Sequence, residues 1–399
     1  MIDSIISHFS VSSVPCTYKR FGAGLIHDTY LCECKEGGTL HQYILQRINT
    51  AIFPHPQQIM SNIQKVTEHL TKKLQARGIA DPFYMTPTLV LTKSGETFYP
   101  HQDGTSWRMF HFIQRGIVVD FIQNRQHAYE VGRGLGAFQA ELRDLNPSVL
   151  YETLPGFHTL PAYFAEYESA LKGNPKNRVK EVEQETLFIF KRRDFISQFE
   201  QRLKSGNVPI RIVHYDPKVN NIMLRQDTHT ALCMLDLDTV MPGYAPLDFG
   251  DCVRSAANPA GEDELDLSKV TLHLPFFEAI TSGYFLEARS FLTHQEIEML
   301  PDAAKAITFE LGLRFLADYL RGDTYFKVQY PTHNKDRARV QFKLLESMEA
   351  SEDQMRQIVT IAAGEQLIDI CGEEVTAMAC AKKCGSKKAT KKKTAKKKK

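Results

Sequence analysis

Two short apolar segments joined by a polar turn constrain the fold of this chain more than any other feature. Residues 222–224 and 231–235 are apolar, and six polar residues separate them. This pattern predicts a β-hairpin. Asp216 and Asn221 precede the first strand and Asp236 follows the second, so a hairpin brings the three side chains to one end. The sequence therefore predicts an oxygen-rich site at that end of the hairpin.

The residues at this end of the hairpin suit phosphoryl transfer. That reaction needs a base for the proton of the attacking hydroxyl and oxygen ligands for Mg²⁺. The spacing His-x-Asp-x-x-x-x-Asn from His214, followed by a strand-end Asp, is the catalytic-loop pattern of kinases. We predict Asp216 as the general base and Lys218 as a cation for the γ-phosphate of ATP. The predicted Mg²⁺ ligands are Asn221, Asp236 and Asp238. The alternative is a surface hairpin with incidental carboxylates.

The first 110 or so residues predict a small β-rich lobe that binds ATP. The turn from Gly22 to Gly24 lies between strand-like segments, and its backbone is expected to cover the phosphates. Arg47 is near the end of a later strand and is the predicted phosphate-binding cation, paired with Glu68 on the following helix. The last strand leads to a hinge at Phe112, whose backbone is expected to meet adenine. The simpler interpretations are an ordinary turn, a surface arginine and a solvated glutamate.

A second acidic motif, Asp248-Phe249-Gly250, has the letters of the metal motif of protein kinases. Its position argues against that role. The metal-binding Asp must follow the strand that pairs with the catalytic loop, and that strand ends at Asp236. Because Asp248 precedes a helical segment, we predict that it caps this helix.

From residue 114 the pattern becomes mainly helical. Gly132 and Gly136 lie one turn apart in a predicted helix, which indicates a close helix contact. No Ala-Pro-Glu motif follows the site, which favours a small-molecule acceptor over a protein. The predicted fold class is α+β, a bilobal protein-kinase-like fold with a small β-rich N-lobe and a large, mostly helical C-lobe. The predicted domains are a nucleotide-binding lobe (1–113), a catalytic and substrate-binding lobe (114–375) and a disordered Lys-rich tail (376–399).

The net charge of +2 conceals an acidic body. Lys382–Lys399 contain eleven lysines and no acidic residue, and without them 38 basic side chains face 47 acidic ones, a net charge of about −9. Such a body has no electrostatic basis for binding nucleic acid. The lysine-rich end is too repulsive and too poor in apolar residues to fold. It is either a non-specific tether for anionic surfaces or a dispensable end.

Cysteine usage and hydropathy predict the compartment. Eight cysteines in 399 residues do not indicate a disulfide scaffold, and without paired C-x-x-C motifs zinc is not expected. The N-terminus lacks a basic segment followed by a long apolar one, and no stretch approaches the roughly 20 apolar residues of a membrane span. We expect a cytoplasmic protein with reduced cysteines and no membrane span, in which Cys233 is buried beside the site.

The chain resembles the aminoglycoside-phosphotransferase-like (choline/aminoglycoside kinase) superfamily and, within it, the N-acetylhexosamine 1-kinases. The resemblance covers roughly residues 15 to 350. The superfamily part lies in His214-x-Asp216-x-x-x-x-Asn221 with Asp236. The narrower part lies in Gly24-x-Ile26-x-Asp28-Thr29-Tyr30, Leu45-Gln46-Arg47-Ile48-Asn49, Leu237-Asp238-Thr239-Val240-Met241-Pro242-Gly243, Glu310-Leu311-Gly312-x-Arg314-Phe315, Gly322-Asp323-x-Tyr325-Phe326 and Gln341-Phe342-Lys343.

The resemblance implies ATP- and Mg²⁺-dependent phosphorylation of the anomeric hydroxyl of N-acetylglucosamine or N-acetylgalactosamine. The product is a sugar 1-phosphate of the kind used in nucleotide-sugar salvage. The resemblance also implies that Arg314 and Tyr325 bind the sugar, while Asp216 and Asp236 face the reacting hydroxyl.

The chain departs from this family in the glycine-loop segment. The family tends to have Gly-His-Ile-Asn-Asp where this chain has Gly24-Leu25-Ile26-His27-Asp28. Either His27 takes over part of the sugar contact, or the acceptor differs from the usual sugar. The open alternatives are a related phosphotransferase for an aminoglycoside, choline, homoserine or another sugar, and a non-catalytic nucleotide-binding protein.

Overall fold

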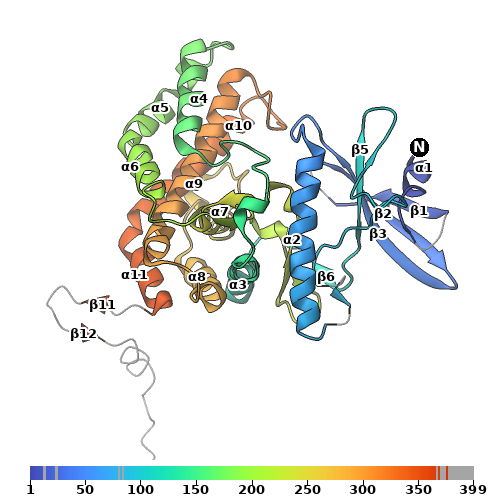
Figure 1. The fold of residues 1–399 in the computed structure, drawn as a ribbon. Coiled ribbons are helices and arrows are strands. Elements are labelled where there is room, and N and C mark those ends of the chain that lie inside the picture. Colours follow the sequence, from blue (N-terminus) through green and yellow to red (C-terminus); the bar gives the residue numbers. More distant parts are fainter. Residues whose placement is uncertain are drawn as a thin grey trace, which may run out of the picture.

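The fold was analysed in a computed structural model that describes residues 1–11, 15–22, 26–79, 81–82, 85–364, 367–368 and 374–375. It has the predicted α+β class, with an antiparallel sheet on one side and a helical lobe on the other (Figure 1). The predicted phosphate-loop residue Gly24 and the Lys-rich tail (376–399) lie outside the described residues.

The N-lobe is built on a five-stranded antiparallel sheet in the order β1-β2-β3-β5-β4. Gly37 and Gly38 form the tight turn between β2 and β3, both with positive φ, as two-residue hairpins require. Helix α1 (Ile2–Ile6) packs its isoleucines on Leu45 and Trp107 of this sheet. The strands are β1 (Cys16–Arg20), β2 (Asp28–Glu36), β3 (Thr39–Ile48), β4 (Tyr99–Pro100) and β5 (Ser106–His111).

Helix α2 (Pro56–Ala76) lies between the sheet and the helical lobe (Figure 1). Its buried residues Ile59, Ile63 and Val66 repeat at three to four positions, as predicted for one apolar face. They belong to the same core as residues of the helical lobe. This helix therefore joins the two lobes through apolar packing.

Two small sheets lie at the start of the helical lobe and frame the predicted site. Strands β8 and β9 pair as an antiparallel hairpin, so the predicted hairpin is confirmed. Strand β6 pairs with β8, and β7 pairs with β10. The strands are β6 (Gly116–Ile117), β7 (Arg211–Val213), β8 (Ile222–Arg225), β9 (Ala231–Met234) and β10 (Met241–Gly243).

Nine helices make up most of the described C-lobe. The close helix contact predicted at Gly132 and Gly136 is confirmed, because a Cβ on Gly132 would lie 2.0 Å from the carbonyl oxygen of Ile280. The helices are α3 (Arg125–Leu142), α4 (Leu160–Gly173), α5 (Glu183–Phe190), α6 (Arg193–Leu203), α7 (Ala245–Ala256), α8 (Leu274–Ala288), α9 (His294–Arg321), α10 (His333–Ala350) and α11 (Glu352–Ala363). Two short strands, β11 (Leu367–Ile368) and β12 (Glu374–Val375), pair beyond α11.

The expectation that all cysteines are reduced is wrong for one pair. Cys16 and Cys34 form a disulfide with their Cα atoms 4.3 Å apart. They are directly opposite in the β1–β2 register, where antiparallel neighbours come close enough to bond. Cys233 is half-buried rather than buried. Cysteine density could not reveal a pairing that depends on strand register.

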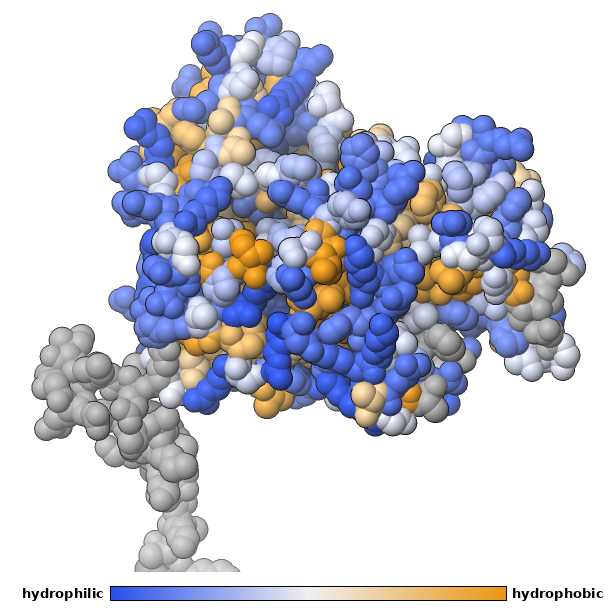
Figure 2. Space-filling view, in the orientation of Figure 1, coloured by the Kyte–Doolittle hydropathy of each residue, from blue (hydrophilic) through white to orange (hydrophobic). Residues whose placement is uncertain are grey.

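Among the described helices, none combines the length and apolar character needed to cross a bilayer. The face in Figure 2 is mainly hydrophilic, with hydrophobic residues in small separate patches.

Candidate active site

The predicted catalytic loop connects β7 to β8. Residues 214–218 lead into a short 3₁₀ helix, η4 (Val219–Asn221), directly before β8. A bond from the Leu235 amide to the Asn221 carbonyl (2.7 Å) extends the hairpin beyond its strands. Asp236 follows, and η5 (Leu237–Thr239) continues the chain to β10. The hairpin thus brings Asn221 and Asp236 together, as its spacing predicts.

Asp248 holds the start of this loop from α7. Its carboxylate accepts bonds from the backbone N–H groups of His214 (2.8 Å) and Tyr215 (2.7 Å), and from the side chain of Gln139. The predicted cap is wrong: α7 begins at Ala245 and Tyr244 is its N-cap, so Asp248 lies in the first turn. Its position instead satisfies two buried backbone donors that no strand partner reaches. Asp248 is therefore structural, as predicted, but it orders the catalytic loop rather than the helix.

The remaining backbone groups of the loop also have side-chain partners. Thr239 donates to the His214 carbonyl (2.6 Å), and His158 donates to the Tyr215 carbonyl (2.8 Å). The Asp216 amide donates to Nδ1 of His214 (3.3 Å), whose Nε2 donates to the Leu235 carbonyl. Because buried backbone groups need partners, these bonds fix the loop before any ligand binds.

The predicted base and its cation lie in direct contact. Nζ of Lys218 is 2.7 Å from Oδ2 of Asp216, and the Asn221 side-chain amide donates to the same carboxylate (2.9 Å) and to the Asp216 carbonyl (2.7 Å). Burial lowers the pKa of Lys218, but Asp216 raises it more, so the lysine stays protonated. The Asn221 nitrogen is thereby used, which leaves its carbonyl oxygen as the group able to bind a cation.

Two further carboxylates, Asp236 and Asp238, gather beside Asp216. Asp236 has a φ of +56°, a left-handed conformation that is uncommon for a non-glycine residue and typical of functional positions. Desolvation and then the carboxylates of Asp238 and Asp216 raise its pKa above the ordinary range, although the residue is exposed. Among the described residues it forms no ion pair with a basic side chain. This site carries a local excess of negative charge.

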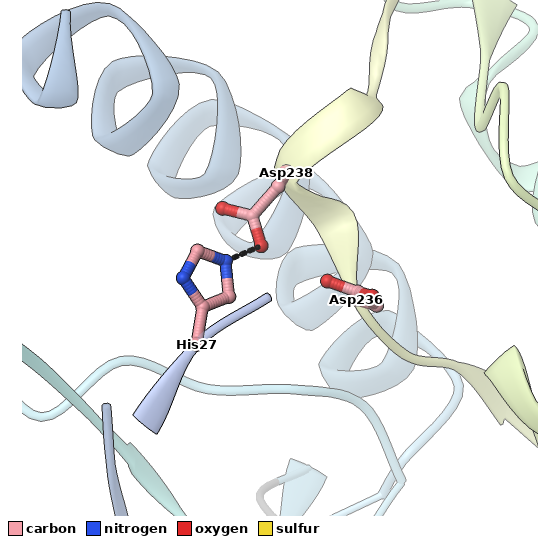
Figure 3. Close-up of side chains that lie close together, drawn as sticks. All are labelled: His27, Asp236 and Asp238. Carbon is pink, nitrogen blue, oxygen red and sulfur yellow. Dashed lines mark hydrogen bonds and ion pairs between the residues drawn. The ribbon is translucent and has the colours of Figure 1, made fainter. Parts of the chain in front are cut away.

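Asp238 of the helical lobe is bonded to two residues of the N-lobe. Both of its oxygens accept bonds from the guanidinium of Arg108 on β5, and both side chains are 2% exposed. His27 also donates through Nε2 to Asp238 (3.2 Å), because its Nδ1 accepts the Asn49 amide (Figure 3). Burial raises the pKa of Asp238, but Arg108 and His27 lower it more, to well below its ordinary value. The predicted metal ligand Asp238 is thus already occupied by cationic and polar partners.

The donor set here fits a hard divalent cation. His27, Asp236 and Asp238 have potential ligand atoms within 4.8 Å of one another, and Asn221 lies directly before β8 of the hairpin whose second strand leads to Asp236. Mg²⁺ prefers carboxylate and carboxamide oxygens. Since Asp236 lacks a basic partner and Asp238 has one, Asp236 and Asn221 are the better ligands.

The predicted pair between Arg47 and Glu68 is not formed among the described residues. Arg47 pairs with Asp28 on the neighbouring strand (2.5 Å) and is 47% exposed, while Glu68 accepts from Gln64 on its own helix. Arg47 is opposite Trp107 in the β3–β5 register, one position away from Arg108. Successive strand residues point to opposite faces, so Arg108 is the arginine that reaches the site.

The phosphate turn and the hinge are only partly placed. Gly22 has a φ of +76°, which a turn at this position requires. The predicted adenine contact at Phe112 cannot use its amide, because that amide donates to the Gln42 carbonyl (3.0 Å). The Phe112 ring instead packs edge-on against Phe21, next to Gly22.

The predicted acceptor residues come together on the helical lobe. The Arg314 guanidinium on α9 lies 5.1–6.0 Å from the centroids of four aromatic rings, those of Phe157, Tyr163, Tyr325 and Phe326. It is 16% exposed, and its ion-pair partner Glu310 is 3.9 Å away. No hydrogen bond of this guanidinium occurs within the described part of the chain. Its donors therefore remain available for a polar ligand.

Asp318 fixes the loop that carries Tyr325. Its buried carboxylate accepts from the backbone amides of Thr324, Tyr325 and Phe326, each at 2.9 Å. Asn334 donates to the same carboxylate (3.0 Å). The aromatic half of the Arg314 cluster is thus held by bonds that involve no ligand.

Sequence reasoning missed three residues of this site, namely Arg108, His158 and Glu310. The only local signal for Arg108 is a charged residue between Trp107 and Met109 in an otherwise apolar strand. His158 and Glu310 belong to distant segments, and their bond of 2.8 Å spans 152 residues. No spacing pattern reveals such a pair.

Comparison with known proteins agrees with this geometry. Residues 17–272 match the model of APH, the phosphotransferase enzyme family. A solved aminoglycoside phosphotransferase from Alicyclobacillus acidocaldarius is similar, with a TM-score of 0.56 and 14% identity over 90% of this chain and 96% of that chain. A choline kinase from Cryptosporidium parvum has a TM-score of 0.52 and 13% identity, over 91% of this chain and 98% of that chain.

A Plasmodium vivax ethanolamine kinase is also similar, with a TM-score of 0.50 and 13% identity over 83% of this chain and 84% of that chain. At these identities the solved structures bear on the fold alone. The family match, which covers more than half of the chain, includes both the β-rich lobe and the catalytic hairpin. The chain therefore belongs to the APH phosphotransferase enzyme family.

Proposed function

We propose that this chain transfers the γ-phosphate of ATP to the anomeric hydroxyl of an N-acetylhexosamine, either N-acetylglucosamine or N-acetylgalactosamine. The observation that carries the proposal is the fixed carboxylate of Asp216 together with the unbonded guanidinium of Arg314. In this proposal residues 1–113 bind the nucleotide and residues 114–375 bind the acceptor and carry out the chemistry. The product is a sugar 1-phosphate.

Asp216 is the proposed general base. Its carboxylate accepts the proton of the sugar hydroxyl as the oxygen attacks the γ-phosphorus and the bond to ADP breaks. The bonds from Lys218 and Asn221 orient this carboxylate and leave its other oxygen toward the acceptor. Lys218, in contact with Asp216, is the proposed cation for the transferred phosphoryl group.

Asn221 and Asp236 are the proposed ligands of Mg²⁺. When bound, Mg²⁺ neutralises the phosphate oxygens of ATP and orients them. Asp236 suits this role because its carboxylate is exposed and, among the described residues, forms no ion pair with a basic side chain. Asp238 supports the site by holding Arg108 and His27 next to it.

The nucleotide is proposed to bind against the N-lobe sheet. The turn at Gly22 and Gly24 covers the phosphates, and Arg47 contacts them after releasing its exposed bond to Asp28. Adenine lies next to the hinge near Phe112. The hinge binds it through groups other than the Phe112 amide, which is already hydrogen-bonded. Glu68 has no role in this proposed nucleotide site because it does not pair with Arg47.

Arg314 and Tyr325 are the proposed sugar ligands. A guanidinium with free donors can bind the hydroxyl and acetamide oxygens of the sugar, and aromatic rings can cover its apolar face. The same cation argues against choline or an aminoglycoside, since both are cationic and Arg314 would repel them. His27 is hydrogen-bonded to Asp238 and to the Asn49 amide. It therefore helps to hold the N-lobe against Asp238, and it contacts the sugar only if these bonds change.

An acceptor panel tests this function. The protein is incubated with Mg-ATP and N-acetylglucosamine, N-acetylgalactosamine, glucose, galactose, choline, homoserine or kanamycin, and ADP release is followed. We expect turnover with an N-acetylhexosamine and phosphate on its C1 oxygen by NMR. Turnover only with a non-sugar, or phosphate on another oxygen, would refute the proposed substrate.

Variants of the acceptor site sharpen this test. Arg314→Met keeps the length of the side chain and removes its donors, so we expect a higher KM for the sugar and an unchanged affinity for nucleotide. Arg193→Met, at an exposed position of α6, is the matched control. Equal KM values for both variants would remove Arg314 from the acceptor site. Nucleotide binding without ADP release across the panel would instead support the non-catalytic alternative.

A further inference from the structure

A buried histidine joins the acceptor cluster to the catalytic loop. Nδ1 of His158 lies 2.8 Å from Oε1 of Glu310 on α9, and its Nε2 lies 2.8 Å from the carbonyl oxygen of Tyr215. Glu310 is one helical turn from Arg314, and Tyr215 directly precedes Asp216. The His158 and Glu310 side chains are 6% and 2% exposed. One imidazole thus bridges the two halves of the site.

The two partners of the imidazole are both acceptors. A backbone carbonyl cannot donate a proton, so Nε2 must carry one to bond Tyr215. The Glu310 carboxylate, which has Arg314 within 3.9 Å, can only accept, so Nδ1 must also carry a proton. A neutral imidazole has one N–H and would leave one of these buried acceptors without a partner.

The charges around His158 agree with this protonation state. Burial lowers the pKa of His158, but Glu310 and then Asp251 and the Tyr215 carbonyl raise it more, so the net pKa lies above its ordinary value. Asp251 approaches from α7, Glu310 and Arg314 from α9, and the neighbouring rings are those of Phe157 and Tyr215. Arg314 is the nearby cation that disfavours a positive charge on His158. Arg254 donates a hydrogen bond to Asp251.

The backbone of this bridge is also in uncommon conformations. His158 has a φ of +55° and Tyr215 a φ of +63°, both in the left-handed region. Such conformations are unfavourable for residues other than glycine and persist only where neighbouring bonds stabilise them. The two bonds of the imidazole supply stabilisation at both residues.

We propose that His158 acts as an imidazolium that positions the catalytic loop by holding the Tyr215 carbonyl, and that keeps Arg314 available to the acceptor by binding Glu310. His158 is a positioning residue, since it touches Tyr215 and Glu310 and no reacting group. If His158 loses its positive charge, Glu310 draws Arg314 from 3.9 Å into a closer ion pair and away from the acceptor. This inference rests on the proposed function for its kinetic part only.

Protonation of His158 is measured directly by NMR. Protein with ¹⁵N-labelled histidine is titrated from pH 6 to 9, and His158→Gln identifies the signals. We expect both ring nitrogens of His158 to remain protonated at pH 7.5, and Glu310→Gln to bring its deprotonation to lower pH. A neutral ring at pH 7.5 would overturn the inference whether or not the protein phosphorylates any sugar.

Loop position and kinetics provide the second readout. In His158→Gln the amide signals of Tyr215 and Asp216 should shift, and kcat should fall by up to about 10²-fold, the scale of a displaced catalytic group. KM for the acceptor should rise in the same variant, and the alkaline limb of the kcat profile should move to lower pH in Glu310→Gln.

His127→Gln is the matched control, since His127 is also buried but lies on α3 and stacks on His229. It should leave these amide signals and kcat unchanged. If His158→Gln and His127→Gln behave alike, the positioning role is wrong. If the wild-type protein phosphorylates none of the acceptors, the proposed function fails, while the NMR shifts still decide the role of His158.

Discussion

The catalytic loop and the nucleotide-facing strands differ in how their key groups are held. Each backbone N–H and C=O of His214, Tyr215 and Asp216 has a side-chain partner, from Asp248, Thr239, His158, His214 itself or Asn221. On the N-lobe, the predicted phosphate ligand Arg47 is 47% exposed, and its one ionic partner within the described part of the chain is Asp28. The chain thus fixes the proposed base internally and leaves the proposed nucleotide ligand more exposed.

Arg47 and Arg108 of the N-lobe sheet show the same contrast between an exposed and a firmly held side chain. Arg108 and Arg47 are on adjacent strands, and a shift of one register position separates them. Arg108 is buried with Asp238, whereas Arg47 stays at the surface. Burial rather than sequence position therefore decides which arginine belongs to the catalytic side.

The largest effect should come from removing the base. Asp216→Asn keeps the bonds to Lys218 and Asn221 nearly intact but cannot accept the proton, so we expect kcat to fall by about 10²–10⁴-fold. Initial rates of ADP release measure the change. Nucleotide affinity and the thermal midpoint should match the wild type. A variant with full kcat would show that the fixed carboxylate is not the base.

Arg108 and Arg47 should differ strongly in how much they contribute to the unfolding free energy of the protein. Arg108→Met leaves Asp238 charged and buried without its partner, which costs about 3–5 kcal/mol of unfolding free energy. Arg47→Met removes an exposed ion pair and should cost less than about 1 kcal/mol. Urea unfolding of both variants measures the difference. Equal losses would contradict the distinction between a buried and an exposed cation.

Asp248→Ala should weaken the catalytic loop without touching its chemistry. Two backbone N–H groups lose their acceptor, at a cost of roughly 1–3 kcal/mol for an unsatisfied buried group. Urea unfolding together with faster amide exchange at His214 and Tyr215 measures this effect. Asp353→Ala, at an exposed position of α11, is the control and should change neither quantity. Unchanged exchange at both amides would refute the assigned role of Asp248.

The smallest effect concerns pH. The pKa of His158 is raised on folding, so its contribution to stability is complete below the unfolded pKa, near 6.5, and is lost as pH rises through the folded value. Each pKa unit of difference contributes about 1.4 kcal/mol. The unfolding free energies of the wild type and of His158→Gln should therefore converge as the pH rises above the unfolded pKa. Parallel curves would indicate an unshifted histidine.

Local patterns predicted what is local in this molecule. The hairpin, its two flanking carboxylates and Asn221 follow from spacing within 25 residues, and the structure brings them together. The position of Arg47 on its strand predicted a phosphate-binding cation but could not show that this side chain pairs with Asp28 and is 47% exposed. That depends on which face of the sheet the helical lobe covers.

Long-range contacts account for the rest. Arg108–Asp238 spans 130 residues, His158–Glu310 spans 152, and the Cys16–Cys34 bridge depends on strand register. The Asp248 motif illustrates the same limit. Its letters matched the kinase metal motif and its position predicted a helix cap, whereas its carboxylate accepts from the backbone of a loop 34 residues earlier. Packing between distant segments therefore determined the roles that spacing could not predict.

The position of the transferred phosphate tests the account most directly. The product formed from Mg-ATP and N-acetylglucosamine is examined by ³¹P–¹H correlation NMR, with Asp216→Asn run in parallel. The account predicts a phosphorus signal coupled to the anomeric proton, at a strongly reduced rate of formation in the variant. Phosphate coupled to the C3, C4 or C6 proton, or the same rate in the variant, would contradict it.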